Sequence, residues 1–118
     1  MCLICDTFPK NMNRLDTLNQ LLKKDPKSSF LLFAIAKEYE TLNDYQSAVK
    51  FYKELSINDP DYTGCYYHFA KALFKLQYKK EGMEIIDNGL VICTKNNQLH
   101  DLSELKNLKM NLLIEDYD

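Results

Sequence analysis

The sequence is poor in the features that mark membrane spans, phosphate-binding loops and nucleic-acid surfaces. Its 118 residues include only three glycines, and they form no glycine-rich phosphate loop. No stretch approaches the roughly eighteen consecutive apolar residues that a membrane span needs. The formal net charge is -2, and the lysine pairs at 23–24 and 79–80 are expected to be solvated rather than to form a basic patch. We therefore expect neither nucleic acid nor a membrane as a partner.

Signs of catalysis and of secretion are also lacking. The two histidines, His68 and His100, stand in no recognisable order with a nucleophile and an acid. We therefore predict that the protein is not an enzyme and uses no cofactor. The N-terminal segment 1–5 is too short for the apolar core of a secretory signal. We expect a cytoplasmic protein whose four cysteines are reduced.

A period of 34 residues is the most informative feature that the sequence does contain. The pairs Asp25-Pro26 and Asp59-Pro60 lie 34 residues apart, and amphipathic stretches recur at the same interval. A proline disfavours helical geometry at the residue before it, so each pair marks the end of a helix. A unit of two amphipathic helices cannot bury its apolar face alone, and such units stack into solenoids. The period therefore predicts a binding scaffold, without naming what is bound.

The residues of this period resemble the tetratricopeptide repeat family. In the first copy the family's bulky, small and aromatic slots are filled in order by Leu32, Ile35-Ala36, Tyr39, Ala48, Tyr52, Leu55 and Pro60. In the second copy the corresponding residues are Tyr66, Phe69-Ala70, Leu73, Gly82, Ile86 and Gly89. Small residues are needed where two helices cross closely. We therefore expect close backbone approach at Gly82 and Gly89.

Two further strings, 62–68 and 100–105, narrow the resemblance to short bacterial tetratricopeptide proteins, common in Bacteroidetes-like genomes. The resemblance implies an all-α fold, a right-handed helical solenoid of antiparallel helix pairs with about six helices. It also implies a noncatalytic scaffold that binds a protein or a peptide. It implies no particular chemistry and no named partner.

The expected organisation is a flexible segment at 1–11 followed by one domain at 12–115. Its parts are an N-terminal capping helix at 12–24, repeats at 29–62 and 63–96, and a C-terminal capping helix at 98–114. The last helix is expected to present one apolar side made of Leu99, Leu102, Leu105, Leu108 and Leu112. Asp44 and Asp61 are placed to act as N-caps of the helices that follow them.

In the family's fold the first helices of successive repeats line a concave face. The residues predicted to bind the partner there are Phe30, Phe33, Lys37, Glu40, Tyr67, Lys71, Phe74 and Lys75. Lys37 and Lys71 are 34 residues apart, so we expect them one above the other and pointing to solvent. Cations beside aromatic rings suit an extended peptide that bears a carboxylate and apolar side chains.

Alternatives to this groove remain open. The lysines can simply be solvated and the aromatic rings partly buried between repeats. The pattern that clamps a C-terminal carboxylate matches poorly, because Phe33 stands in a lysine slot and Lys37 in an asparagine slot.

A second functional class is a self-associating structural protein, whose groove or terminal helix docks onto a second copy. The expected oligomeric state is accordingly a monomer or a weak homodimer. A third class would use metal, because Cys2, Cys5, Cys65 and His68 have the ligand types of a tetrahedral zinc site. No spacing signature links the two pairs, so we predict no metal.

Overall fold

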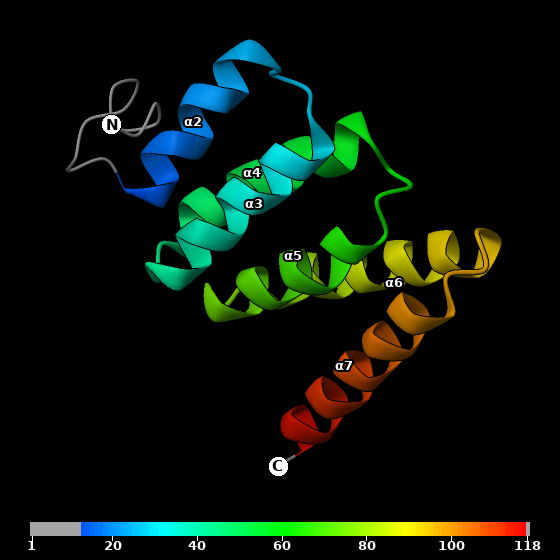
Figure 1. The fold of residues 1–118 in the computed structure, drawn as a ribbon. Helices are drawn as coiled ribbons and strands as arrows, with labels where there is room; N and C mark the ends of the chain where they lie inside the picture. Colours follow the sequence, from blue (N-terminus) through cyan, green and yellow to red (C-terminus); the bar gives the residue numbers. More distant parts are fainter. Residues whose placement is uncertain (1–12, 118) are drawn as a thin grey trace.

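The computed structural model describes residues 13–117, which form six helices and no strand (Figure 1). The helices are α2 (Arg14–Lys24), α3 (Ser29–Thr41), α4 (Tyr45–Asn58), α5 (Gly64–Lys75), α6 (Lys79–Lys95) and α7 (Leu99–Tyr117). The predicted all-α fold class is confirmed. None of these helices combines the length and apolar character needed to cross a bilayer. The predicted flexible segment 1–11, with Cys2 and Cys5, lies outside the described residues.

The two Asp-Pro pairs form equivalent connections between successive helix pairs. Asp25 has φ −142° and ψ 74°, and Asp59 has φ −144° and ψ 75°, so both leave helical geometry in the same way. The following proline imposes this change, because its ring clashes with a helical residue before it. The period found in the sequence is therefore also a period of backbone geometry.

The turns inside the helix pairs share a second geometry. Asn43, Gln77 and Asn97 have φ values of 60°, 67° and 57°, in the left-handed region. In each turn the amide of the next residue donates a 2.9 Å hydrogen bond to the carbonyl five residues earlier, which closes a Schellman motif. Asparagine tolerates this conformation better than glutamine does. Gln77 thus adopts the same turn as Asn43 without the usual sequence signal.

One of the two predicted helix caps is wrong. Asp44 caps α4, where its carboxylate accepts a 3.2 Å hydrogen bond from the amide of Ser47. The cap position of α5 is instead Thr63, because the loop after Pro60 runs two residues further than expected before the helix begins. Asp61 accepts a 2.9 Å hydrogen bond from the side-chain amide of Asn96 and so joins two loops.

Close helix crossings occur at the two predicted glycines. A Cβ added at Gly82 would lie 2.7 Å from Cε2 of Phe74. One added at Gly89 would lie 2.8 Å from Cβ of Tyr66 and 2.8 Å from Cδ1 of Leu105. Real side chains do not approach this closely, so α6 lies against α5 and α7 only because these positions lack a side chain. The expectation of close backbone approach is confirmed at Gly89, which lies against the Cβ of Tyr66, whereas at Gly82 the ring of Phe74 occupies the space.

The last helix, α7, packs against α6 and α5. Leu105 is completely buried, and Lys109 Nζ lies 2.7 Å from Asp87 Oδ1 of α6. The expectation for Leu99 is wrong, because 66% of its surface is exposed. Leu99 precedes Leu105 by six residues, which places it about a third of a turn away around the helix axis.

Replacement of Leu105 by Ala should lower the free energy of unfolding by about 2 to 5 kcal/mol, because the side chain fills a closed site beside Gly89. The matched variant Leu99→Ala should change it by less than about 0.5 kcal/mol, since that side chain is exposed. Urea denaturation followed by circular dichroism measures both values. Equal losses in the two variants would contradict the placement of α7.

Candidate functional site

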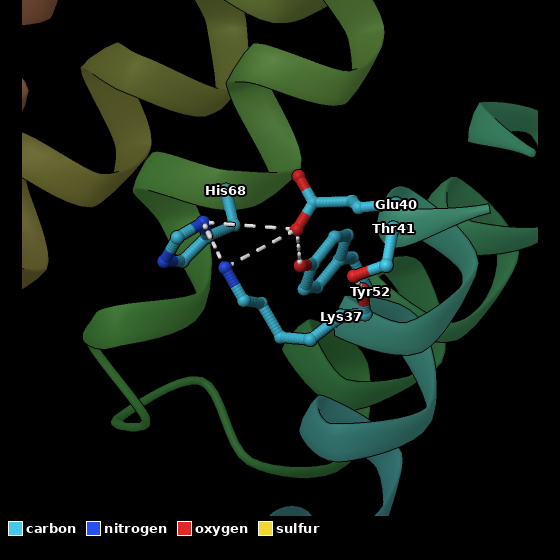
Figure 2. Close-up of polar contacts among 5 residues, drawn as sticks. All are labelled: Lys37, Glu40, Thr41, Tyr52 and His68. Carbon is cyan, nitrogen blue, oxygen red and sulfur yellow. Dashed lines mark hydrogen bonds and ion pairs between the residues drawn. The ribbon is translucent and has the colours of Figure 1, made fainter. Parts of the chain in front are cut away.

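The first helices of the two repeats, α3 and α5, meet at a cluster of polar and aromatic side chains. We call this set the junction cluster: it comprises Phe33, Lys37, Glu40, Tyr52, Tyr67 and His68. Tyr52 comes from α4 and the others from α3 and α5. Figure 2 shows Lys37, Glu40 and Tyr52 converging with His68 from the facing helix.

The polar contacts of the junction cluster centre on one carboxylate oxygen. Tyr52 donates a 2.6 Å hydrogen bond to Oε2 of Glu40, and Lys37 Nζ lies 3.6 Å from the same atom. Lys37 Nζ also lies 3.3 Å from Nδ1 of His68, which is itself 3.8 Å from the Glu40 oxygen (Figure 2). The carboxylate is largely buried, so these contacts replace water around its charge.

The surroundings of His68 favour its neutral form. Burial lowers its pKa below the ordinary value of 6.5, the charge of Lys37 lowers it further, and Glu40 opposes both effects. Because an ammonium group can only donate, Nδ1 accepts from Lys37 and the ring proton lies on Nε2. For Tyr52, in contrast, burial and the hydrogen bond to Glu40 raise the pKa, so its hydroxyl stays protonated and acts as a donor. At neutral pH the lysine and the glutamate are therefore the charged members of the cluster.

Aromatic rings surround these polar groups. The ring of Phe33 lies 5.5 Å from that of His68 and 5.5 Å from that of Tyr62, between centroids. His68 also meets the ring of Tyr67 edge-on at 5.3 Å, and Tyr52 stacks on Phe69 at 6.2 Å. These separations fall in the range of favourable ring pairs. Phe33 thus packs within the contact between the repeats.

A pocket of about 320 Å³ lies beside the junction cluster, between α5 and α7. We call it the α5–α7 pocket: its lining residues are Lys71, Phe74, Lys75, Gln77, Leu108, Leu112 and Glu115. Lys71 Nζ lies 5.1 Å from the ring centroid of Tyr67, which connects the pocket to the cluster. The pocket therefore combines an apolar floor with two cations on one wall and an acid on the other.

The structure brings most of the predicted site residues into these two places. Phe33, Lys37, Glu40 and Tyr67 belong to the junction cluster, whereas the pocket contains the other three α5 residues, Lys71, Phe74 and Lys75. Phe30 belongs to neither and is 68% exposed. Whether these residues bind a partner stays a prediction.

The expectation that Lys37 simply points to solvent is wrong. Its side chain is 43% exposed, but its ammonium group contacts His68, which is 31 residues further along the chain. Lys37 therefore contacts His68, which lies three residues before its equivalent residue Lys71 on α5.

Sequence reasoning missed several residues of this surface. Tyr52 was assigned only to an aromatic slot of the family, and His68 was weighed as a catalytic histidine and as a metal ligand but not as part of a binding surface. Leu108, Leu112 and Glu115 were missed as pocket residues, because the last helix was treated as a cap. The available sequence signal was the leucine at every third or fourth position of this helix. Two of these leucines, Leu108 and Leu112, lie beyond the fully buried Leu105.

The described residues offer little support for a metal site. Burial, with the nearby charge of Asp59, raises the pKa of Cys65 to about 12, so its thiol is protonated and a poor ligand. His100, Asp101 and Glu104 each bring one ligand atom within 4.8 Å of the others. Asp101 already accepts a hydrogen bond from Thr63, and the positive end of the helix dipole disfavours a cation there. We therefore assign no ion to these three residues.

Comparison with known proteins agrees with this architecture. Residues 12–89 match the family model described as anaphase-promoting complex, cyclosome, subunit 3. Protein DIA2 of Saccharomyces cerevisiae is 27% identical over 124 residues. That alignment covers 98% of this chain but spans only 17% of the length of the yeast protein.

Solved structures of tetratricopeptide proteins are also similar. The tetratricopeptide repeat domain protein of Salinibacter ruber has 28% identity and a TM-score of 0.67 in its crystal structure, over 71% of this chain and 93% of that one. Its solution structure has 29% identity and a TM-score of 0.68, over 73% and 87%.

A Bordetella parapertussis protein is similar in fold, with a TM-score of 0.75 at 20% identity, over 89% of this chain and 91% of that one. The family model covers more than half of the residues. The chain therefore belongs to the family of the anaphase-promoting complex, cyclosome, subunit 3 model, within the tetratricopeptide repeat proteins.

Proposed function

We propose that this protein is a noncatalytic interaction module that binds a segment of a partner protein across the junction cluster and the α5–α7 pocket. Tetratricopeptide proteins generally act in protein-protein interaction. The observation that carries the proposal for this chain is the pocket, where Lys71 and Lys75 stand beside Phe74. Within residues 13–117 neither lysine forms an ion pair with a carboxylate, so their charges are available.

The pocket suits a segment that carries an acidic and an apolar side chain. Lys71 and Lys75 are one helical turn apart, about 6 Å along the axis, so a carboxylate can reach both. Phe74, Leu108 and Leu112 provide an apolar surface for a neighbouring aliphatic or aromatic side chain. Charge-assisted hydrogen bonds fix the orientation, and apolar burial supplies affinity.

The predicted residues divide into three roles in this proposal. Tyr67, Lys71, Phe74 and Lys75 contact the partner directly. Lys37, Glu40 and Phe30 extend the surface along α3, with the charge of Lys37 partly neutralised by Glu40. Phe33 acts mainly by holding α3 against α5, because its ring is engaged by Tyr52, Tyr62 and His68.

We also propose a cytoplasmic location. Cys65 and Cys93 are buried free thiols in the described chain, which is usual in a reducing compartment. A bacterial source, inferred from the resemblance, stays a prediction.

Selection of a random peptide display library on the purified protein tests the groove. Enriched peptides should combine Asp or Glu with aliphatic or aromatic residues. Combining Lys71→Glu with Lys75→Glu should weaken their binding at least about tenfold, since charge-assisted hydrogen bonds are lost and repulsion replaces them. The loss of affinity should be smaller at high salt, because salt screens the charges. The helical circular dichroism of the double variant should equal that of the wild type.

The matched control is Lys53→Glu, which reverses a lysine in a separate hollow beside Ile57 of α4. It should leave binding unchanged. The groove proposal is wrong if Lys53→Glu abolishes capture while the Lys71 and Lys75 double variant still binds.

Binding of a selected acidic peptide should tighten as the pH falls from 7.5 to about 5.5. In the free protein His68 is neutral, because burial and the charges of Lys37 and Lys71 lower its pKa, against the opposing charges of Glu40 and Glu104. A bound carboxylate raises that pKa, so the protonated protein binds the peptide more tightly.

The variant His68→Gln should lose this pH dependence while it keeps peptide binding at pH 7.5. Isothermal titration calorimetry at several pH values measures the effect. Identical pH profiles for the two proteins would show that the peptide does not lie near His68.

A further inference from the structure

A hollow of about 300 Å³ lies between the second helices of the two repeats, α4 and α6. We call it the α4–α6 hollow: its lining residues are Val49, Lys53, Ser56, Ile57, Phe69, Leu73, Glu81, Glu84 and Ile85. Figure 1 shows α4 behind α3 and α6 behind α5. The hollow shares no lining residue with the α5–α7 pocket, so it is a separate surface.

Three helices each contribute one face to the α4–α6 hollow. The α4 residues stand at positions 49, 53, 56 and 57, and the α6 residues at 81, 84 and 85. This spacing of three or four keeps the side chains of each helix in one row. Phe69 and Leu73 of α5, one turn apart, form the floor between the rows, where they are only 4% and 2% exposed. Rows at this spacing, with a gap between them, suit the packing of a further helix.

Apolar surface at the edge of this hollow is in contact with water. Val49 and Ile85 are partly buried beside the floor, but Ile57, near the end of α4, is 68% exposed. An exposed apolar side chain next to an apolar hollow is typical of an interaction site rather than of scattered surface residues.

The charges on the two sides of the hollow differ in sign. Glu81 and Glu84 line the α6 side and Lys53 the α4 side, and all three are exposed. Within residues 13–117 none of them forms an ion pair, so the two sides do not neutralise each other across the gap. Glu81 lies in the first turn of α6, where the helix dipole offsets part of its charge. Glu84 is therefore the stronger anion, and Lys80, one turn before it, forms no ion pair with it.

We propose that the α4–α6 hollow binds an amphipathic helix of a partner protein, whose apolar face has basic side chains along one edge and acidic side chains along the other. The apolar face covers Ile57 and the floor, as in other helix-in-groove contacts. The basic edge meets Glu84, and the acidic edge meets Lys53. This arrangement fixes the direction of the bound helix, because turning it round would set like charges against each other on both sides.

A display library built on an alanine-based helix, randomised on one face and along both edges of that face, tests the proposal by selection on the full chain. One class of selected helices should carry Lys or Arg on one edge and Asp or Glu on the other. Their affinity should fall at least about tenfold in Glu84→Lys, because a charge-assisted contact becomes repulsive. It should not change when Lys71→Glu is combined with Lys75→Glu, which separates this surface from the α5–α7 pocket.

Two matched controls lie outside the hollow. Glu54→Lys reverses another exposed glutamate, on α4, and should leave the affinity unchanged. Ile57→Ser should weaken binding severalfold, whereas Val91→Ser should not, although Val91 is also exposed, at 66%. Circular dichroism confirms that every variant remains helical. Replacing the basic residue of a selected helix by Glu should restore its binding to the Glu84→Lys variant, which assigns the contact to this pair of charges.

Three results would overturn the proposal. In the first, every selected helix depends on Lys71 and Lys75, so the α4–α6 hollow binds nothing from the library. In the second, the selected helices tolerate Glu84→Lys and Ile57→Ser as well as they tolerate the control changes. In the third, sedimentation equilibrium shows that the chain self-associates and that Glu84→Lys abolishes the association, so the occupant is a second copy and not a partner protein.

Discussion

The side chain of Tyr52 connects the two repeats, and the rest of the surface depends on that connection. It is completely buried on α4, donates its hydroxyl hydrogen to Glu40 of α3 and stacks on Phe69 of α5. The hydroxyl and the ring therefore bind different helices. Ring pairs of this kind add about 0.5 to 1.5 kcal/mol beyond burial of the ring surface itself. The carboxylate of Glu40 also contacts Lys37 and His68. Through its hydrogen bond to Glu40, Tyr52 therefore also positions the polar centre of the junction cluster.

Beyond the contact between α4 and α5, close helix crossings position α6 and α7. Gly82 and Gly89 allow α6 to approach α5, and Leu105 of α7 lies against Gly89 and Tyr66. Leu105 is fully buried at the centre of α7, and Leu102, Leu108 and Leu112 pack against the core in part. Further along, the helix stands far enough from α5 to leave the α5–α7 pocket between them. The pocket thus follows from the same packing.

The period and the small residues were enough to predict the helices, their order and their crossings. They could not predict the contacts between repeats, because a period identifies equivalent positions and not neighbouring ones. Lys37 is equivalent to Lys71 but contacts His68, which lies three residues earlier on the same helix. The solvent exposure of Leu99 was missed for a similar reason, because a run of leucines does not reveal which of them the neighbouring helices cover.

The central claim is that the junction cluster makes the two repeats one cooperative unit with a preformed surface. Native-state hydrogen exchange resolved for each helix tests this most directly. Slowly exchanging amides in the middle of α4 and of α5 should open with the same free energy, equal to that of global unfolding. If α3 and α4 exchange with a much lower free energy while α5 and α6 remain protected, the repeats open separately and the account is wrong.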